Sequence, residues 1–207
     1  AQIVLSTRRF TDLGPVDSRA MQVTVGAGVT IADWRSHARA AGLDAGLDFA
    51  ARDSATVGGA IGTNAGGSRV LRFGTMRSQV VGIEAALSTG EIVGHLGGLP
   101  KETAGLPWPS VLAGSEGTLG IVTAARLRLV PRYLHTCTAM VALPSLGAAV
   151  ELLARLRSGV SSLDAVELLM PEALRLVADL LGTTPPVDPS GAVVLGDCAD
   201  HRVPSGG

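Results

Sequence analysis

Two glycine-rich segments contain the residues of this chain that are best suited to chemistry. The first is TVGGAIGTNAGG at residues 56–67, and the second is LAGSEGTLG at residues 112–120. Glycine exposes backbone N–H groups, and Thr, Ser and Asn add short donors, so such loops can wrap a phosphate without positive side chains. Two of them imply an extended phosphate-containing ligand. Taken singly, the same glycines could instead serve tight turns and close packing of helix on sheet.

Several familiar catalytic patterns are absent. GxxxxGK[ST] does not occur, and no GxGxxG follows a strand with an acidic residue about twenty positions later, which argues against a P-loop and a Rossmann site. GSEG at residues 114–117 is not the GxSxG of a hydrolase nucleophile. His37, His95, His135 and His201 have no mutual spacing suited to one metal ion. We therefore expect no metal site and no hydrolase.

Composition excludes further classes of function. The chain has 207 residues, of which 46% are hydrophobic, so it is long and apolar enough to fold. Its 17 Lys and Arg nearly balance 18 Asp and Glu, and we expect no nucleic-acid partner. Cys137 and Cys198 lie far apart without a CxxC, which suggests neither a disulfide framework nor a zinc site. With no apolar run near the roughly 18 residues of a membrane span, we expect a cytoplasmic protein without a transmembrane segment.

Hydrophobic patterns predict the elements that must position the two segments. Thr30 with Asp33 three positions later is typical of a helix start, and Gly42 stops the pattern. Trp34 and Trp108 are expected to pack in the core. The expected elements are a strand at 22–25, a helix over 30–41, a hairpin with strands at 80–87 and 91–93, and a strand at 121–130 ended by Pro131.

The pattern changes after Pro131, where glycine becomes rarer and apolar strands alternate with amphipathic helices. A boundary therefore lies near Pro131 to Tyr133, and we expect an α+β protein with domains at residues 1–131 and 132–207. The second domain has predicted strands at 138–143, 163–169 and 192–195 and predicted helices at 145–157 and 171–181.

Three motifs carry a resemblance to a known family. They are LDFAARDSATVGG at residues 47–59, continuing to Gly67, then RFGTMR at 72–77, and GSEGTLGIVT at 114–123. In this order and spacing they resemble the FAD-binding PCMH-type domain of the FAD-linked oxidases, within the vanillyl-alcohol oxidase superfamily. The D-lactate dehydrogenase and glycolate oxidase large-subunit branch is most similar. The residues after Pro131 resemble the start of the family's cap domain.

The resemblance implies a fold and a cofactor. Residues 1–131 would form the second subdomain of the PCMH-type domain, a mixed sheet with helices, and residues 132–207 part of a ferredoxin-like α+β cap. FAD would be bound in extended form. The residues that the resemblance and the glycine pattern nominate for FAD binding are Asp53, Ser54, Thr56, Gly58, Gly59, Ile61, Thr63, Asn64, Gly67, Glu116, Gly117, Gly120, Ile121 and Val122.

The activity implied by the resemblance is the oxidation of a 2-hydroxy acid such as D-lactate or glycolate, or of a related alcohol, by hydride transfer to the flavin. The expected partners are this small-molecule substrate and an electron acceptor that the sequence does not identify. The competing hypothesis is a non-catalytic, truncated domain that keeps the fold without productive FAD binding.

The chain also departs from the family pattern. No further glycine-rich phosphate loop precedes Gln2, and nothing like HGHxGDGN occurs, so we expect an incomplete chain without the N-terminal phosphate-loop subdomain. Ser54 stands where some relatives attach the flavin through Cys, which excludes a cysteinyl bond. Arg77 precedes Ser78 rather than Asp, and it either contacts phosphate or substrate or is held by a loop carbonyl.

Overall fold

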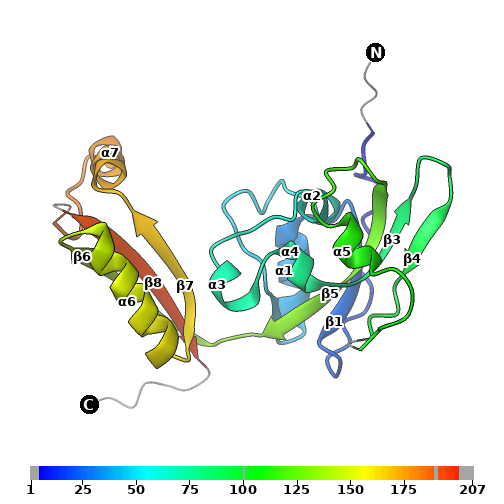
Figure 1. Ribbon diagram of the computed structural model, residues 1–207, viewed down its shortest axis with the longest axis horizontal. Helices are drawn as coiled ribbons and strands as arrows, with labels where there is room; N and C mark the ends of the chain where they lie inside the picture. Colours follow the sequence, from blue (N-terminus) through cyan, green and yellow to red (C-terminus); the bar gives the residue numbers. More distant parts are fainter. Residues whose placement is uncertain (1–4, 100, 189–190, 201–207) are drawn as a thin grey trace. The chain divides into compact units, whose positions relative to one another are not determined.

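The computed structural model describes residues 5–99, 101–188 and 191–200 (Figure 1). The chain divides into two compact units, Ala1–Arg132 and Tyr133–Gly207. Each unit combines helices with a sheet, which confirms the α+β class. None of the helices in the described ranges is long and apolar enough to cross a membrane.

The sheet of the first unit is organised around one long strand. The strand order is β1-β5-β3-β4, and β2 pairs with the end of β5. We expected a mixed sheet, but every pairing among the described residues is antiparallel, because the chain returns from α1 as β2 beside β5 and not beside β1. The strands are β1 (Gln22–Gly26), β2 (Leu43–Ala45), β3 (Val80–Ala86), β4 (Ile92–His95) and β5 (Ile121–Pro131).

Alternation along β5 fixes which side chains enter the core. Leu127 and Leu129 are buried, whereas Arg128 is exposed on the other face, as the alternating sequence predicts. Pro131 ends β5 as predicted, and it is still paired opposite Leu43 as the last residue of the strand. Strands β3 and β4 pair as the predicted hairpin.

The predicted helix at residues 30–41 is α1 (Ile31–Ala40). The Oγ1 atom of Thr30 accepts the backbone N–H of Asp33 over 3.0 Å, which is the expected cap. Trp34 is fully buried, and its indole Nε1 has no hydrogen-bond partner in the described part of the protein. Trp108 is half-buried against the same core, so the packing role expected of both tryptophans is confirmed.

An ionic cluster joins α1 to β2. Asp44 is buried and accepts hydrogen bonds from Arg35 at 3.2 Å and Arg39 at 2.9 Å. Burial alone would raise the pKa of Asp44, but the hydrogen bond from Arg39 and the charges of Arg35, Arg39 and Arg69 outweigh it, so the pKa is lowered. Arg69 also donates to the carbonyl of Ala45 over 2.6 Å, and the cluster thereby fixes the chain just before the first glycine-rich segment.

Four short helices lie between β2 and β5 in the sequence: α2 (Val57–Gly62), α3 (Val70–Phe73), α4 (Met76–Gln79) and α5 (Trp108–Leu112). The first glycine-rich segment, which we interpreted as a loop, therefore contains a helix. Glycine disfavours helix by about 1 kcal/mol per residue, so tertiary contacts must hold α2.

The second unit contains β6 (His135–Leu143), α6 (Leu146–Gly159), β7 (Leu163–Leu169), α7 (Pro171–Leu181) and β8 (Ala192–Asp200). Its antiparallel sheet has the order β6-β8-β7. Strands β6 and β7 are consequently parallel to each other with β8 between them, which is the split βαβ arrangement of ferredoxin-like folds. Helix α6 packs Ala149 against Ala192 and Val194 of β8.

Candidate functional site

Helix α2 separates apolar side chains from glycines. Val57, Ala60 and Ile61 recur at helical spacing, and all three are buried in the core. The remaining positions of the helix are Gly58, Gly59 and Gly62. The helix therefore presents its side chains to the core, and at Gly62 it leaves bare backbone beside open space.

The start of α2 is fixed by contacts with the chain before α1. The N–H groups of Val57 and Gly58 donate to the carbonyls of Val29 and Ala27, each over 2.8 Å. The N–H of Gly59 donates to the Oγ1 of Thr56 over 3.2 Å. These donors are consequently paired within the protein and are not open to a ligand as the sequence suggested. Gly58 serves close packing instead, because a Cβ atom there would lie 2.8 Å from the Cβ of Ala27.

The second glycine-rich segment folds back onto the end of α2. The N–H of Gly114 donates to the carbonyl of Ile61, and the N–H of Glu116 donates to the carbonyl of Gly62, each over 2.9 Å. These bonds satisfy two of the carbonyls that a helix end leaves unpaired. The two segments, fifty residues apart in sequence, are thereby held side by side.

Left-handed backbone shapes both segments. Asn64 has φ +47°, and Glu116 and Gly117 have φ +51° and +76°. Asn64 uses its Oδ1 to accept the N–H of Arg77 over 2.9 Å. The guanidinium of Arg77 donates to the carbonyl of Ala113 over 2.6 Å, so it is held by a loop carbonyl, the second of the two roles considered for it.

A cavity of about 450 Å³ opens between the two segments. Backbone glycines, small hydroxyl side chains and the first residues of β5 form its walls. The lining residues are Thr7, Thr56, Gly58, Gly59, Gly62, Thr63, Ser115, Glu116, Gly117, Gly120, Ile121 and Val122. Glu116 is the one charged residue among these described residues, so none of them is Lys or Arg.

The walls of this cavity differ in chemistry. Gly62 and Gly117 leave open space, because a Cβ atom on either would meet no other atom within 4 Å. Among the described residues, no hydrogen bond engages the backbone N–H of Gly117 or Gly120. Ile121 and Val122 supply apolar surface. The cavity therefore combines neutral donors, an apolar wall and room where side chains are missing.

A second hollow adjoins the first. It has a volume of about 430 Å³ and shares Gly117, Gly120 and Ile121 with the first cavity. Phe10 and Leu119 give it a mainly apolar lining. The two adjoining hollows together are called the glycine groove.

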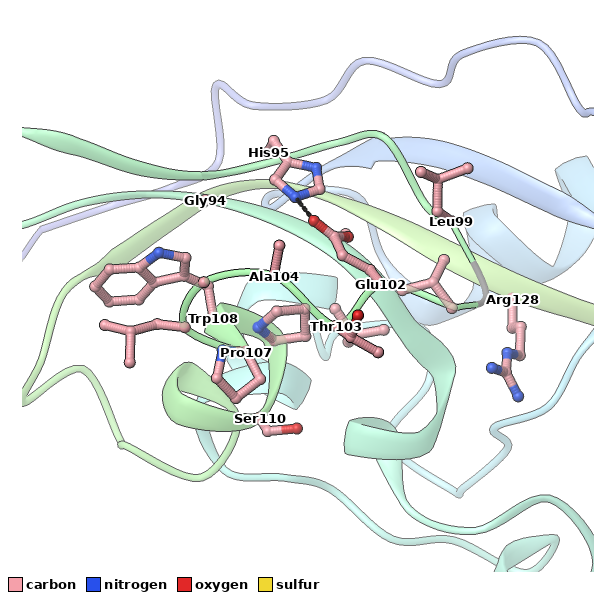
Figure 2. A pocket seen from close by; sticks show the side chains of 16 residues that line it. Gly94, His95, Leu99, Glu102, Thr103, Ala104, Pro107, Trp108, Ser110 and Arg128 are labelled. Carbon is pink, nitrogen blue, oxygen red and sulfur yellow. Dashed lines mark hydrogen bonds and ion pairs between the residues drawn. The ribbon is translucent and has the colours of Figure 1, made fainter.

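A separate cavity of about 430 Å³ lies between β3, β4 and the segment that leads into α5. Figure 2 shows His95 at its edge, where Nε2 lies 2.5 Å from the Oε1 of Glu102. None of the residues nominated from the sequence lines it. Within the described ranges, no three His, Cys, Asp or Glu side chains are grouped as metal ligands, and His201 lies outside those ranges.

The structure brings together nine of the fourteen nominated residues around the first cavity: Thr56, Gly58, Gly59, Thr63, Glu116, Gly117, Gly120, Ile121 and Val122. Asp53 and Ser54 are exposed in the turn before α2 and lie outside the lining, as do Ile61 in the core and Asn64 beside Arg77. Gly67 is also outside, packed against the carbonyl of Asp48.

Sequence reasoning did not nominate three of the lining residues. Gly62 would follow from recognising α2 as a helix, because it lies four positions after Gly58 on the same side. Ser115 is part of the quoted GSEG motif, so its signal was present. Thr7 had none, because its contact comes from the segment before β1, far away in sequence.

Comparison with known proteins finds FAD-dependent relatives. Residues 1–94 match the profile of a family described as FAD binding domain. The chain is 37% identical over 178 residues to D-2-hydroxyglutarate dehydrogenase from Xanthomonas citri pv. viticola. It is 42% identical over 133 residues to D-lactate dehydrogenase from Archaeoglobus fulgidus. Over these stretches the chain is similar to FAD-linked oxidases. A glycolate oxidase subunit from Bacillus subtilis is 36% identical over 130 residues, which confirms the branch expected from the motifs.

The chain spans only part of these FAD-linked oxidases. The match covers 85% of the chain but 37% of the Xanthomonas protein, and 63% of the chain but 29% of the Archaeoglobus protein. A solved alkyldihydroxyacetonephosphate synthase has a TM-score of 0.75 at 21% identity, over 93% of this chain and 37% of that one. That likeness shows a shared fold.

FAD is the cofactor of the FAD-linked oxidase family, and the glycine groove has the features that FAD requires. A pyrophosphate needs hydrogen-bond donors, and the groove offers the hydroxyl of Ser115 and two N–H groups, of Gly117 and Gly120, that make no hydrogen bond within the described ranges. A flat ring needs apolar walls without protruding side chains, and Ile121 beside Gly62 and Gly117 provides them. The residues present therefore fit the cofactor.

Proposed function

We propose that this chain binds FAD in the glycine groove and forms part of an enzyme that oxidises a 2-hydroxy acid such as D-lactate or glycolate, or a related alcohol. The observation that carries the proposal is the shared cavity between α2 and the segment before β5. The names of the relatives support the substrate class, since they include dehydrogenases of D-lactate and D-2-hydroxyglutarate. Bound FAD supplies the two-electron chemistry by taking up the hydride of the substrate.

Within this proposal, the chain's residues bind and orient the cofactor. The hydroxyl of Ser115 and the N–H groups of Gly117 and Gly120 donate to the pyrophosphate. The hydroxyl of Thr63 donates to the carbonyl of Gly59 over 3.0 Å and closes the wall beside them. Neutral donors in a fixed geometry can hold an anion without a cationic side chain. Val122 and the neighbouring Ile121 exclude water from one face of the ring system.

The nominated residues outside the lining act through others. Asn64 positions the backbone of Arg77, whose guanidinium holds Ala113 near the start of the second segment. The side chain of Ile61 anchors α2 in the core, and its carbonyl accepts a hydrogen bond from the N–H of Gly114. Asp53 and Ser54 precede Thr56, the cap of α2. Gly67 lets the end of the first segment pack against the carbonyl of Asp48, where a Cβ atom would not fit.

The two units take different roles in the proposal. Residues 1–131 form the FAD-binding domain, and residues 132–207 form part of the ferredoxin-like cap that contributes to substrate binding. A small-molecule electron donor and a separate electron acceptor are the partners. The cytoplasm is the proposed location, because the relatives matched in bacteria and archaea act on small metabolites and the two cysteines are free thiols.

Titration with FAD tests the proposal. We expect the chain to quench flavin fluorescence in a saturable manner, with riboflavin binding more weakly because it lacks the pyrophosphate. Reduction of the bound flavin by D-lactate, glycolate or D-2-hydroxyglutarate, followed by bleaching of its absorbance, then tests the substrate class. A folded chain that shows no saturable quenching with either flavin favours the non-catalytic hypothesis and overturns FAD binding.

A further inference from the structure

The sheet of the second unit brings its two cysteines together. Cys137 of β6 is the direct register partner of Cys198 of β8, although sixty-one positions separate them in sequence. The pairing of these strands runs without a register shift from His135 opposite Asp200 to Leu143 opposite Ala192. Beside the cysteines, Thr138 donates from Oγ1 to the Oδ1 of Asp197 over 2.6 Å, a side-chain contact between the next pair in the same register.

Direct opposition places the two cysteines at the Cα separation expected of paired residues in antiparallel strands. Opposed residues of antiparallel strands point to the same face, with Cα atoms about 4.5–5.5 Å apart. A disulfide joins Cα atoms that are about 4.4–6.8 Å apart, so the register meets this requirement without moving either strand. Both cysteines are free thiols, and Cys137 is exposed while Cys198 is half-buried. A reagent in solution therefore reaches Cys137 first.

We propose that Cys137 and Cys198 form a reversible cross-strand disulfide when the chain meets a small-molecule disulfide such as glutathione disulfide. The thiolate of Cys137 attacks one sulfur of the reagent, its S–S bond breaks, and one glutathione thiolate leaves. The thiolate of Cys198 then attacks the sulfur of Cys137 and expels the second glutathione. The two protein thiols lose two electrons and two protons in total, and the reagent gains both as two glutathione thiols.

The position of the bond explains why it would be reversible. It would join β6 to the central strand β8, in a part of the sheet where Cys137 is open to solvent. Exposed disulfides have higher reduction potentials than buried structural ones and exchange readily with thiols. In a reducing compartment the pair stays as two thiols, and a rise in oxidised glutathione converts it.

Oxidation in glutathione redox buffers tests this inference. The folded chain is equilibrated at graded ratios of reduced to oxidised glutathione, quenched with iodoacetamide, and mapped as peptides without reduction. We expect a linked pair of peptides containing Cys137 and Cys198, and a monomeric chain on non-reducing gels. The equilibrium constant for forming this disulfide with glutathione should be roughly tenfold or more larger in the folded chain than in the urea-unfolded chain. Two glutathiones per chain, or a disulfide-linked dimer, would overturn the inference.

A shifted thiol provides the matched control. The double variant Cys137→Ser/Ala139→Cys moves one thiol two residues along the same face of β6, to a position diagonal to Cys198. Diagonal neighbours are about 7–8 Å apart, beyond the disulfide range. The folded variant should therefore form the disulfide no more readily than the unfolded variant. An equal preference in this variant would show that strand opposition is not the cause. Circular dichroism of the reduced variant verifies that it folds.

Discussion

The backbone N–H of Glu116 donates to the carbonyl of Gly62 over 2.9 Å, and both residues line the same cavity. This bond joins the second glycine-rich segment to the last residue of α2. Gly62 faces open space there, because a Cβ atom on it would meet no other atom within 4 Å. The backbone at Gly62 does not need glycine, because its φ is not positive. The missing Cβ atom instead leaves room in the cavity.

Gly62→Leu should separate cofactor binding from stability. Gly62 lies in a helix, where replacing Gly favours the fold by up to about 1 kcal/mol, so the thermal midpoint should stay or rise. The new side chain would enter the cavity, and we expect FAD affinity to fall roughly tenfold or more, which corresponds to about 1.4 kcal/mol. Fluorescence titration and thermal denaturation measure the two effects.

Gly147→Leu is the matched control for this substitution. Gly147 lies in α6 of the second unit and is exposed, so the same change in helix propensity occurs away from the groove. Its FAD affinity should equal that of the unaltered chain. If Gly62→Leu also binds FAD normally, the ligand is not seated beside α2.

Adjacent positions 116 and 117 should respond with opposite signs. Gly117 has φ +76°, so Gly117→Ala should lower the free energy of unfolding by about 1 kcal/mol. Glu116 adopts φ +51° despite its side chain, and Glu116→Gly should raise the free energy by up to about 1 kcal/mol. Urea denaturation measures both. Glu116→Ala keeps the Cβ atom and should not raise the free energy of unfolding. A rise in this variant would mean that the carboxylate, and not the backbone conformation, destabilises the fold.

Asp44 should make the first unit sensitive to acid. Its pKa is lowered from the ordinary value of 3.8 in the folded chain, so its contribution is fully present above that value and is lost as the pH falls through the lowered pKa. Asp44→Asn should cost about 2 kcal/mol at pH 7, because it removes a buried carboxylate that pairs with Arg35 and Arg39. Arg35 keeps its second pair, with Asp48. Stability measured between about pH 6 and pH 3 should then fall less steeply in the variant.

Glu151→Gln serves as the control for the acid experiment. Glu151 pairs with Arg155 at 4.0 Å on the exposed face of α6, where such pairs contribute about 0.5 kcal/mol or less. Its stability profile against pH should follow that of the unaltered chain. If the free energy of unfolding of Asp44→Asn falls with pH as steeply as that of this control, protonation of Asp44 does not account for the acid sensitivity.

FAD binding should depend weakly on salt. The residues that line the described cavity include no Lys or Arg, so no cationic side chain is screened when ions are added. We expect the dissociation constant to change by less than about threefold between roughly 50 mM and 500 mM NaCl. Equilibrium dialysis at each concentration measures it. A tenfold weakening would place the pyrophosphate against cationic side chains outside this lining.

The sequence predicts the elements that carry strong local signals. The cap at Thr30, the hairpin in residues 80–93 and the alternation along β5 all have residue types that favour one structure, and each is present. The three motifs likewise indicate the similarity to FAD-linked oxidases. Local signals therefore suffice where side chain, turn and hydrophobic period agree.

Helix α2 shows where local signals fail. Three of its six residues are glycine, and its intrinsic propensity is against a helix. The helix exists because Val57 and Ile61 are fully buried and because Gly58 can approach Ala27 closely. The neighbouring Thr7 at the cavity and the opposition of the two cysteines likewise depend on long-range pairing, which spacing in the sequence does not reveal.

The placement of the aromatic residues gives the chain a built-in optical separation of its two units. Both tryptophans, Trp34 and Trp108, belong to the first unit, and the second unit contains the one tyrosine, Tyr133. Indole emission will therefore follow the melting of residues 1–132 alone, and the fully enclosed Trp34 should shift toward red wavelengths as it meets water. An unfolding transition that changes the far-ultraviolet circular dichroism but not the tryptophan fluorescence belongs to the unit that begins at Tyr133.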